Sequence, residues 1–338
     1  MNIENTKENN KQPKAGLHCV TDRSSSELFF SLVDYRNNYF TSRDSKKIRE
    51  FYKGFKNRDQ LIQWMEERPK GVPIIHEVEG DKKIIVVIPT AELDGKYAKE
   101  CRESIFKGLH IIFVESSGKN DFYFNFSHFV NAGIRKAMEY DPKWIIYSGD
   151  DVIKIDSPEV LIAKLNPIDN KKIMSVFTKQ GFYHSIPTGL ITQRKIIGYI
   201  ITSIYAVIKG TIGIQIKNHR IWEKYNIKWS LGAKNGLFSK LAYKEFKPFI
   251  LTATFGIFSS EYCKINAGNV LDETFINGCE DWDVSIKLNK LPYEIIDYKI
   301  SELAGSTLGN LKDYNRNTRN ILNMAYLNKK IVEIKDYI

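Results

Sequence analysis

Two adjacent carboxylates, Asp150 and Asp151, directly follow the apolar run Trp144-Ile-Ile-Tyr147 and the linker Ser-Gly. Two negative charges side by side at the end of a buried strand repel each other, so a cation is needed to stabilise them. Mg²⁺ or Mn²⁺ is the natural partner, because these ions take oxygen ligands and bridge carboxylates to substrate phosphates. A surface Asp-Asp turn would use the same residues. The position after a buried strand favours the functional interpretation.

A second acidic pair, Glu280-Asp281, opens an apparent helix in the segment Gly278-Cys-Glu-Asp-Trp-Asp283. A carboxylate within reach of a hydroxyl group can act as a general base. Acidic residues are also favoured in a first helical turn, because the backbone dipole stabilises them there. From the residues alone, helix capping is the simpler interpretation of this pair.

Three buried strands are expected to position these groups. Continuous apolar runs at Ile84–Ile88, His110–Val114 and Trp144–Tyr147 are typical of strands buried on both faces. Helical patterns separate them, from Asp94 to Gly108 and from Ser127 to Tyr140, so the sequence predicts a Rossmann-like α/β fold with a doubly wound, mostly parallel sheet. Ligands bind outside the carboxyl ends of such strands. Polar groups stand at all three ends: Thr90 and Glu92, Glu115, and Asp150 with Asp151.

The remaining chain divides into flanking and inserted segments. We expect a disordered tail at 1–26, an N-terminal helical extension at 27–80 with an amphipathic helix at Arg58–Arg68, a catalytic domain at 81–310 with an insertion at 189–235, and a C-terminal helical segment at 311–338. Further strands are expected at Lys172–Phe177 and Phe249–Thr254. No GxGxxG or GxxxxGK[ST] motif follows the first strand, which disfavours a dinucleotide or P-loop site.

The cysteine content and the charge of the chain limit the compartment and the partners that we expect for it. The four cysteines are scattered without a CxxC pair, which argues against a zinc site or a disulfide framework and suits a reducing compartment. The amino terminus lacks the apolar core of a signal peptide, so a cytoplasmic location is expected. The net charge of +10 is concentrated in residues 191–250, which hold eleven Lys or Arg and two acidic residues. This predicts either an anionic partner or a solvated basic face.

The insertion contains an uncharged 13-residue run, Ile196–Ile208, flanked by Arg194-Lys195 and Lys209. A spanning helix needs about 20 apolar residues, so this run is too short to cross a membrane. An interfacial helix and a buried core or dimer helix both remain open. The basic stretch Lys217–Lys247 favours peripheral contact of residues 189–216 with the inner membrane face, and hence a lipid-linked phosphate or saccharide as acceptor.

Seven short motifs, in order, resemble the nucleotide-sugar glycosyltransferases of the GT-A fold, especially glycosyltransferase family 2. They extend from about Ile84 to Thr307 with a gap at the insertion: Val87-Ile-Pro-Thr90, Val114-Glu-Ser-Ser-Gly118, Asn131-Ala-Gly133, Tyr147-Ser-Gly-Asp-Asp-Val152, Phe255-Gly-Ile-Phe258, Leu271-Asp-Glu-Thr-Phe275 and Gly278-Cys-Glu-Asp-Trp-Asp283. The resemblance implies a metal-dependent, inverting hexosyltransferase. Its donor would be a UDP- or GDP-sugar, and its acceptor a hydroxyl or phosphate on a glycan or lipid-linked phosphate.

The resemblance also assigns roles on the donor side. Thr90 and Glu115 would contact the nucleoside, with Glu92 as a helper. Asp150 would lie near the ribose, and Asp151, the last residue of a DxD-like motif, would bind Mn²⁺ or Mg²⁺.

On the acceptor side, the Glu280-Asp281 pair resembles the motif that supplies the catalytic base, with Asp281 the preferred residue of the two. Leu271-Asp-Glu273 resembles a loop that shapes the acceptor site.

Three departures from the family pattern stand out. Glu115 replaces the commoner Asp, and Gly149 stands where many relatives carry a further Asp. Near Ser301–Thr307 relatives often have a His that assists diphosphate binding; the nearest candidate is Glu302, with His184 as a spatial substitute.

A pyrophosphorylase, a non-catalytic binding protein and a nucleic-acid-binding protein are the alternatives to a glycosyltransferase. A sugar-nucleotide pyrophosphorylase normally has a Gly-rich loop with a basic residue after the first strand, whereas Thr90-Ala-Glu-Leu-Asp-Gly95 is acidic. A non-catalytic GT-A-like binding protein is disfavoured by the intact acidic pairs. Nucleic acid is not expected as a partner, because only the charge favours it and no recognition motif is present.

Overall fold

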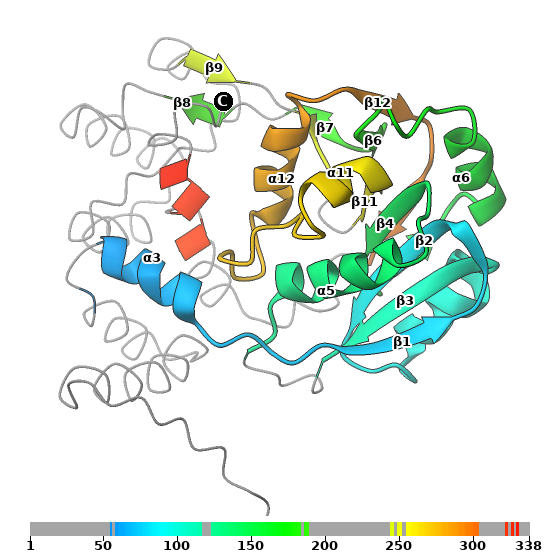
Figure 1. The fold of residues 1–338 in the computed structure, drawn as a ribbon, viewed down its shortest axis with the longest axis horizontal. Helices are drawn as coiled ribbons and strands as arrows, with labels where there is room; N and C mark the ends of the chain where they lie inside the picture. The colour runs from blue at the N-terminus through cyan, green and yellow to red at the C-terminus, as the bar shows by residue number, and fades with distance from the viewer. Residues whose placement is uncertain are drawn as a thin grey trace, which may run out of the picture.

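A seven-stranded sheet, in the order β1-β3-β2-β4-β11-β6-β12, forms the centre of the fold in a computed structural model of the chain (Figure 1). The structure describes Phe55 and residues 58–116, 123–183, 186–188, 244–246, 249–251 and 255–303, with short helical pieces between 322 and 330. The strands are β1 (Ile74–Val78), β2 (Asp81–Thr90), β3 (Leu109–Glu115), β4 (Trp144–Ser148), β6 (Ser175–Thr178), β11 (Phe255–Ser259) and β12 (Tyr293–Ile296). Five of these run in one direction, and only β1 and β11 oppose them. The predicted mostly parallel sheet is confirmed.

Helices cover both faces of this sheet, as the continuous apolar strands predict. Ile84, Val86 and Ile88 of β2 pack toward α4 (Lys96–Glu100), the π-helical turn η1 (Cys101–Ile105) and α6 (Pro158–Leu165). Ile85 and Val87 point the other way, toward α5 (Phe126–Met138), α11 (Ser260–Ile265) and α12 (Glu280–Leu288). Alternation along one strand therefore supplies two cores, and the chain is an α/β fold of the doubly wound kind.

The order of the first parallel strands creates a reversal point. The chain passes from β2 to β3 on one side and then crosses to β4 on the other side of β2. Connections that leave a sheet in opposite directions open a crevice at the carboxyl ends of the two diverging strands. In this sheet those ends are Thr90 of β2 and Ser148 of β4.

Two strand assignments differ from expectation. Ile74–Val78, expected within the helical extension, form β1, whose β-branched residues pair antiparallel with β3. Of the expected strand Phe249–Thr254, Phe249–Ile250 form β10, which pairs with β7 (Phe182–Tyr183) outside the main sheet. The strand that completes the main sheet is the next one, β11, whose residues Phe255–Ser259 are all buried between β4 and β6. Residues 252–254 lie outside the described part of the chain.

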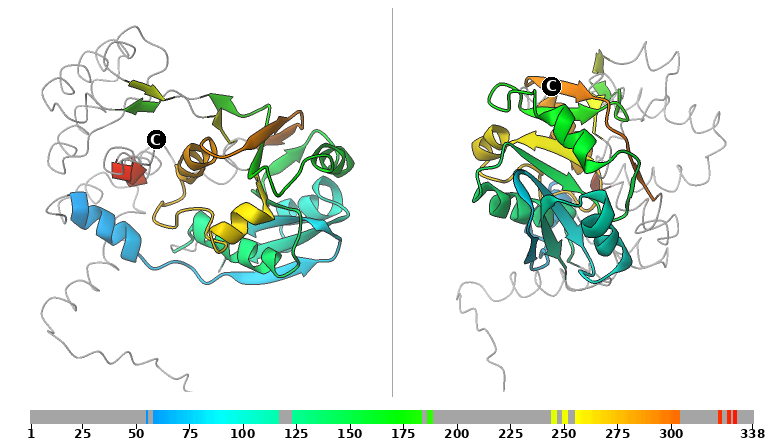
Figure 2. Two further views of the ribbon diagram at one scale, coloured as in Figure 1. Left: turned by 45° about the horizontal axis from the view of Figure 1, so that its top comes forward. Right: turned by 90° about the vertical axis from the view of Figure 1, so that its right-hand side faces the viewer.

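An antiparallel ribbon that is not hydrogen-bonded to the main sheet begins against it and extends away from it (Figure 2). It consists of β7 paired with β10, continued in the same register by β8 (Ile186–Thr188) paired with β9 (Lys244–Phe246). Thr188 therefore lies opposite Lys244, and residues 189–243 connect them. The expected insertion at 189–235, including the run Ile196–Ile208, lies outside the described residues.

The two ends of the described chain meet beside α12. Helix α3 (Arg58–Glu67) confirms the amphipathic helix predicted at 58–68, since Leu61 and Trp64 are fully buried. The helical pieces at 322–330 lie next to it in both views (Figures 1 and 2), and Lys329 forms an ion pair with Asp59 at 3.5 Å. The expected tail at 1–26 and residues 304–321 are outside the described residues. Within the described part, no helix combines the length and apolarity needed to cross a membrane.

The close approach of α5 to the sheet depends on Gly133. A Cβ atom at this position would lie 2.3 Å from Val87 Cγ1 and 2.9 Å from Val114 Cγ2. We expect Gly133→Val to lower the free energy of unfolding by about 1–3 kcal/mol, because the added methyl groups overpack a filled interface. Urea unfolding followed by circular dichroism measures the change. Arg135→Val, at an exposed position of the same helix, controls for valine's helix propensity, and an equal loss in both variants would contradict the packing explanation.

Candidate functional site

A hydrogen bond between Thr90 and Asp150 joins the carboxyl ends of β2 and β4. The Thr90 hydroxyl donates to Asp150 Oδ2 over 2.7 Å. The thiol of Cys101 donates to the Asp150 carbonyl over 3.4 Å, which fixes the same residue from the η1 side. Thr90 is buried, whereas the side chains of Asp150 and Asp151 are half-buried. Two residues predicted to face the donor are therefore in direct contact at the reversal point of the sheet.

The environment of Asp150 disfavours its negative charge. Burial, with a further contribution from the neighbouring charge of Asp151, raises its pKa from 3.8 to about 6, although the hydrogen bond from Thr90 acts in the opposite direction. A cation bound between the two carboxylates would offset both effects.

This raised pKa predicts that Asp150→Asn stabilises the metal-free protein at alkaline pH. The folded state binds a proton more tightly than the unfolded chain, so stability falls as the pH rises from about 4 to about 6. Above that window the ionised carboxylate lowers the free energy of unfolding by up to about 3 kcal/mol. Asparagine carries no charge and avoids this loss, and its side-chain oxygen still accepts the hydrogen bond from Thr90. We expect a higher Tm for the variant at pH 8 with a chelator present, and a difference that vanishes near pH 4.

The matched control is Asp94→Asn, because the Asp94 side chain is 88% exposed and its ion pair with Arg102 is long, at 3.7 Å. Exposed pairs of this kind contribute little to stability. A Tm for Asp150→Asn that equals the native value at pH 8 would show that burial does not raise the pKa of this carboxyl group.

Glu115 is anchored at the end of β3 by two partners. Its Oε1 accepts a hydrogen bond from the backbone N–H of Leu93 over 2.9 Å, and its Oε2 lies 3.0 Å from His76 Nε2. The carboxylate thus holds the loop after β2 against the edge strand β1. Glu92 sits in that loop with an exposed side chain, and its backbone N–H donates to the Thr90 hydroxyl over 3.3 Å. His76 was not expected here, because nothing local in the sequence indicates that β1 pairs with β3.

Asp151 directly precedes the short strand β5 (Val152–Lys154), which pairs with β13 (Ile300–Glu302). The carbonyl of Asp151 accepts a hydrogen bond from the N–H of Leu303 over 2.8 Å. The backbone of Glu302 therefore lies opposite Val152, the residue after the acidic pair. The side chain of Glu302 and the whole of His184 fall outside the described residues.

The second acidic pair starts α12, after Cys279 in a left-handed conformation with φ 68°. Burial, followed by the charges of Asp281 and Glu280, raises the pKa of the Tyr147 hydroxyl well above its ordinary value, so both carboxylates lie near this tyrosine. Tyr147 is the penultimate residue of β4, and its ring covers Gly256, where any Cβ would lie 2.3 Å from Tyr147 Cε1. The electrostatic influence of the second pair therefore reaches Tyr147, three residues before Asp150.

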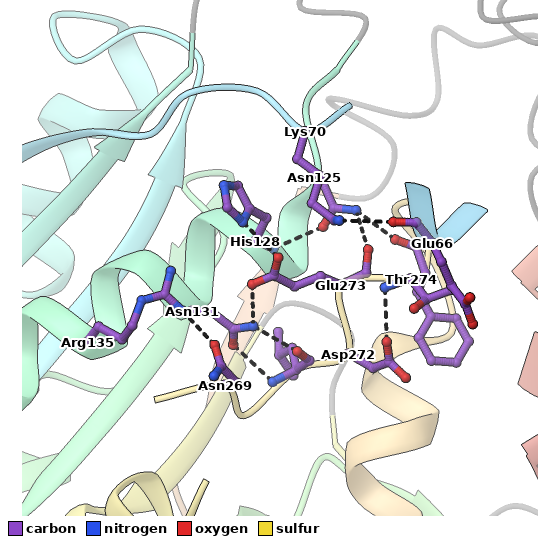
Figure 3. Close-up of polar contacts among 12 residues, drawn as sticks. Glu66, Lys70, Asn125, His128, Asn131, Arg135, Asn269, Asp272, Glu273 and Thr274 are labelled. Atoms are coloured by element: carbon purple, nitrogen blue, oxygen red, sulfur yellow. Dashed lines mark hydrogen bonds and ion pairs between the residues drawn. The ribbon is translucent and has the colours of Figure 1, made fainter. Parts of the chain in front are cut away.

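The loop at 269–279 contains the Leu271–Glu273 segment that is expected to shape an acceptor site, and it is called the acceptor loop after that expectation. Buried amides hold it against α5. The side-chain amide of Asn131 donates to the carbonyl of Leu271 over 2.8 Å, and its oxygen accepts from the N–H of Leu271 over 3.0 Å. Figure 3 shows the Glu273 carboxylate between Asn131 and His128, at 3.0 and 2.8 Å. Asn125 adds bonds to the carbonyls of Glu273 and Phe275. The motif Asn131-Ala-Gly133 thus serves to attach this loop to the helix and the helix to the sheet.

The described side chains include few that could hold the expected Mn²⁺ or Mg²⁺ together. Among the residues that the structure describes, no group of three or more His, Cys, Asp or Glu side chains is arranged to hold a metal ion. Magnesium sites, however, often use one or two carboxylates and complete their shell with water and substrate phosphates. Asp150 and Asp151 fit that kind of site, because they are adjacent carboxylates and a cation would stabilise the charge that burial disfavours at Asp150.

No family model and no curated protein matches the chain. The arrangement offers oxygen ligands for a cation, polar groups at three parallel strand ends, and a second pair of carboxylates nearby.

Proposed function

We propose that this protein is a metal-dependent glycosyltransferase of the GT-A type, which moves a sugar from a nucleotide-diphosphate sugar to an acceptor hydroxyl or phosphate. The observation that carries the proposal is the Thr90–Asp150 hydrogen bond across the reversal point of the sheet, with Asp151 next to it. Ligands of doubly wound sheets bind at that point. Paired carboxylates there suit a substrate that brings a diphosphate and a divalent cation.

In this proposal, the donor lies along the carboxyl ends of β3, β2 and β4. Thr90, Glu92 and Glu115 contact the nucleoside, Asp150 lies near the ribose, and Asp151 holds Mn²⁺ or Mg²⁺. When bound, the cation neutralises the charge of the departing diphosphate. The preference for a UDP- or GDP-sugar follows the family resemblance.

The acceptor meets the donor from the side of α12. Asp281 takes the proton of the acceptor hydroxyl. The oxygen of that hydroxyl bonds to the anomeric carbon of the sugar, and the bond from this carbon to the diphosphate oxygen breaks. The products are the glycosylated acceptor and a nucleoside diphosphate, with inversion at the anomeric carbon because a single displacement occurs. Glu280 supports Asp281, and the acceptor loop borders the incoming group. A glycan or a lipid-linked phosphate as acceptor, and peripheral membrane contact through 189–216 in the cytoplasm, complete the proposal.

A donor panel tests this function. Nucleotide sugars with each base are incubated with the full chain and Mn²⁺, and release of nucleoside diphosphate is measured with and without a chelator. We expect one donor class to be hydrolysed slowly and only with the metal. Consumption of a nucleoside triphosphate and a sugar phosphate with release of pyrophosphate would instead identify a pyrophosphorylase. Metal-dependent donor binding without turnover would identify a non-catalytic binding protein.

A further inference from the structure

The side chain of Lys330, near the carboxyl terminus, reaches two acidic residues of the candidate acceptor side. Its Nζ lies 2.6 Å from Asp272 Oδ2 and 2.5 Å from Asp283 Oδ1. Only 8% of Lys330 is exposed, and its ammonium group lies over the rings of Phe275 and Tyr326, at 5.4 and 5.3 Å from their centres. Lys330 therefore occupies a box of two carboxylates and two aromatic rings.

The charges in this box depend on one another. Burial raises the pKa of Asp272, but the charge and hydrogen bond of Lys330, together with hydrogen bonds from Thr274 and Tyr326, outweigh it, so the pKa lies below its ordinary value. Asp283 is fully buried, and its second oxygen lies 2.8 Å from Lys287. Two carboxylates thus share the buried Lys330, and Asp283 has a second partner in the more exposed Lys287. A buried ion-pair network of this kind is strongly destabilised when one partner is removed.

The two acidic partners belong to different parts of the site. Asp283 lies in the first turn of α12, two residues after Asp281. Asp272 lies in the acceptor loop, next to Glu273, which His128 and Asn131 hold on the opposite side (Figure 3). Contacts from α5 fix one side of the loop, and Lys330 connects its other side to α12. Asn323 adds to this attachment by pairing both backbone groups of Ile276, at 2.8 and 2.9 Å.

We propose that Lys330 is a positioning residue, which fixes the acceptor loop relative to the first turn of α12 and so sets where Asp281 meets the acceptor. This inference rests on the proposed transferase function. It assigns the C-terminal helical segment a part in the acceptor step, because the contacts of Lys330 described above are with the acceptor loop, α12 and Tyr326.

Two substitutions and a neighbouring control test the proposal in the full chain. Lys330→Met keeps the length of the side chain and removes the charge, whereas Lys330→Arg keeps the charge. Lys329→Met is the control, because Lys329 pairs with Asp59 of α3 rather than with the box. Amide hydrogen exchange of residues 271–283, binding of nucleoside diphosphate with Mn²⁺, and kcat and KM for the acceptor are measured for each.

For Lys330→Met we expect exchange in residues 271–283 to speed up by about tenfold or more, because the loop loses its link to α12. Donor binding should stay within about twofold, whereas kcat/KM for the acceptor should fall by about tenfold or more, since misplacement of about 1 Å has such effects. Lys330→Arg should recover most of the loss, and Lys329→Met should behave like the native chain. If Lys330→Met does not fold, Asp272→Asn, which keeps the acceptor oxygen, should show the same pattern with a smaller amplitude.

The outcomes separate this inference from the proposed function. Faster exchange in residues 271–283 without sugar transfer by the native chain would uphold the link and reject the transferase. An active native enzyme whose exchange and acceptor kinetics are unchanged in Lys330→Met would overturn the inference and leave the transferase intact. An equal effect of Lys329→Met would also overturn it.

Discussion

Replacing Asp151 with alanine is expected to lower metal-dependent sugar transfer by about 10²- to 10⁴-fold, because the departing diphosphate loses its electrostatic stabilisation. Asp151 follows the buried strand β4, and the hydrogen bond from Leu303 to its carbonyl holds its backbone in place. The substitution should therefore remove a ligand without disturbing the strand. Initial rates over a range of Mn²⁺ concentrations measure the effect, and Asp151→Asn should need more metal than the native chain for the same rate.

Glu159→Ala is a matched control, since it removes an exposed carboxylate from the first turn of the neighbouring helix α6. Its rate should equal that of the native protein. Native-like activity of Asp151→Ala at every Mn²⁺ concentration would exclude Asp151 as the metal ligand and undermine the donor half of the proposed function.

Asp281→Asn is expected to lower kcat by about 10²- to 10⁴-fold, the usual contribution of a general base. Asparagine has the same shape but cannot accept the proton. Binding of nucleoside diphosphate should stay unchanged, because the proposed donor residues lie at or just after the ends of β2, β3 and β4 rather than on α12. Steady-state kinetics with saturating donor, together with direct titration of the nucleotide, separate the two effects.

Glu280→Gln distinguishes the two acids of the pair. Glu280 is more buried than Asp281, which suits support of its neighbour better than contact with an incoming acceptor. We expect a smaller loss of kcat for Glu280→Gln than for Asp281→Asn. The reverse order would make Glu280 the base, and full activity of both variants would place the base elsewhere.

The first three parallel strands could be predicted because each is buried on both faces and reads as a continuous apolar run. Edge strand β1 has exposed and half-buried residues, so its sequence lacks that signal. The wrong position of the strand predicted at Phe249–Thr254 has a different cause. Two apolar runs follow each other there, and only tertiary pairing decides that β11 enters the main sheet while β10 joins the ribbon.

The same distinction holds for the candidate site. Thr90, Glu115 and Asp150 could be predicted together, because parallel strands that share a direction end at the same edge of a sheet. Contacts made through tertiary packing left no local pattern. His76 is 39 positions from Glu115, and Lys330 is 58 positions from Asp272, so neither partner shows a periodicity that would reveal it.

The antiparallel ribbon has an evolutionary consequence. Because Thr188 and Lys244 pair with each other, residues 189–243 begin and end at one place on the domain. The ribbon already holds the two ends of this segment together. Each doubling of the segment's length would therefore add only about 0.6 kcal/mol to the entropic cost of closing the loop. Mutation can lengthen, shorten or exchange this part of the gene while the strands that carry the acidic pairs keep their pairing. Paralogues that share the sheet could therefore diverge mainly in the segment that corresponds to residues 189–243.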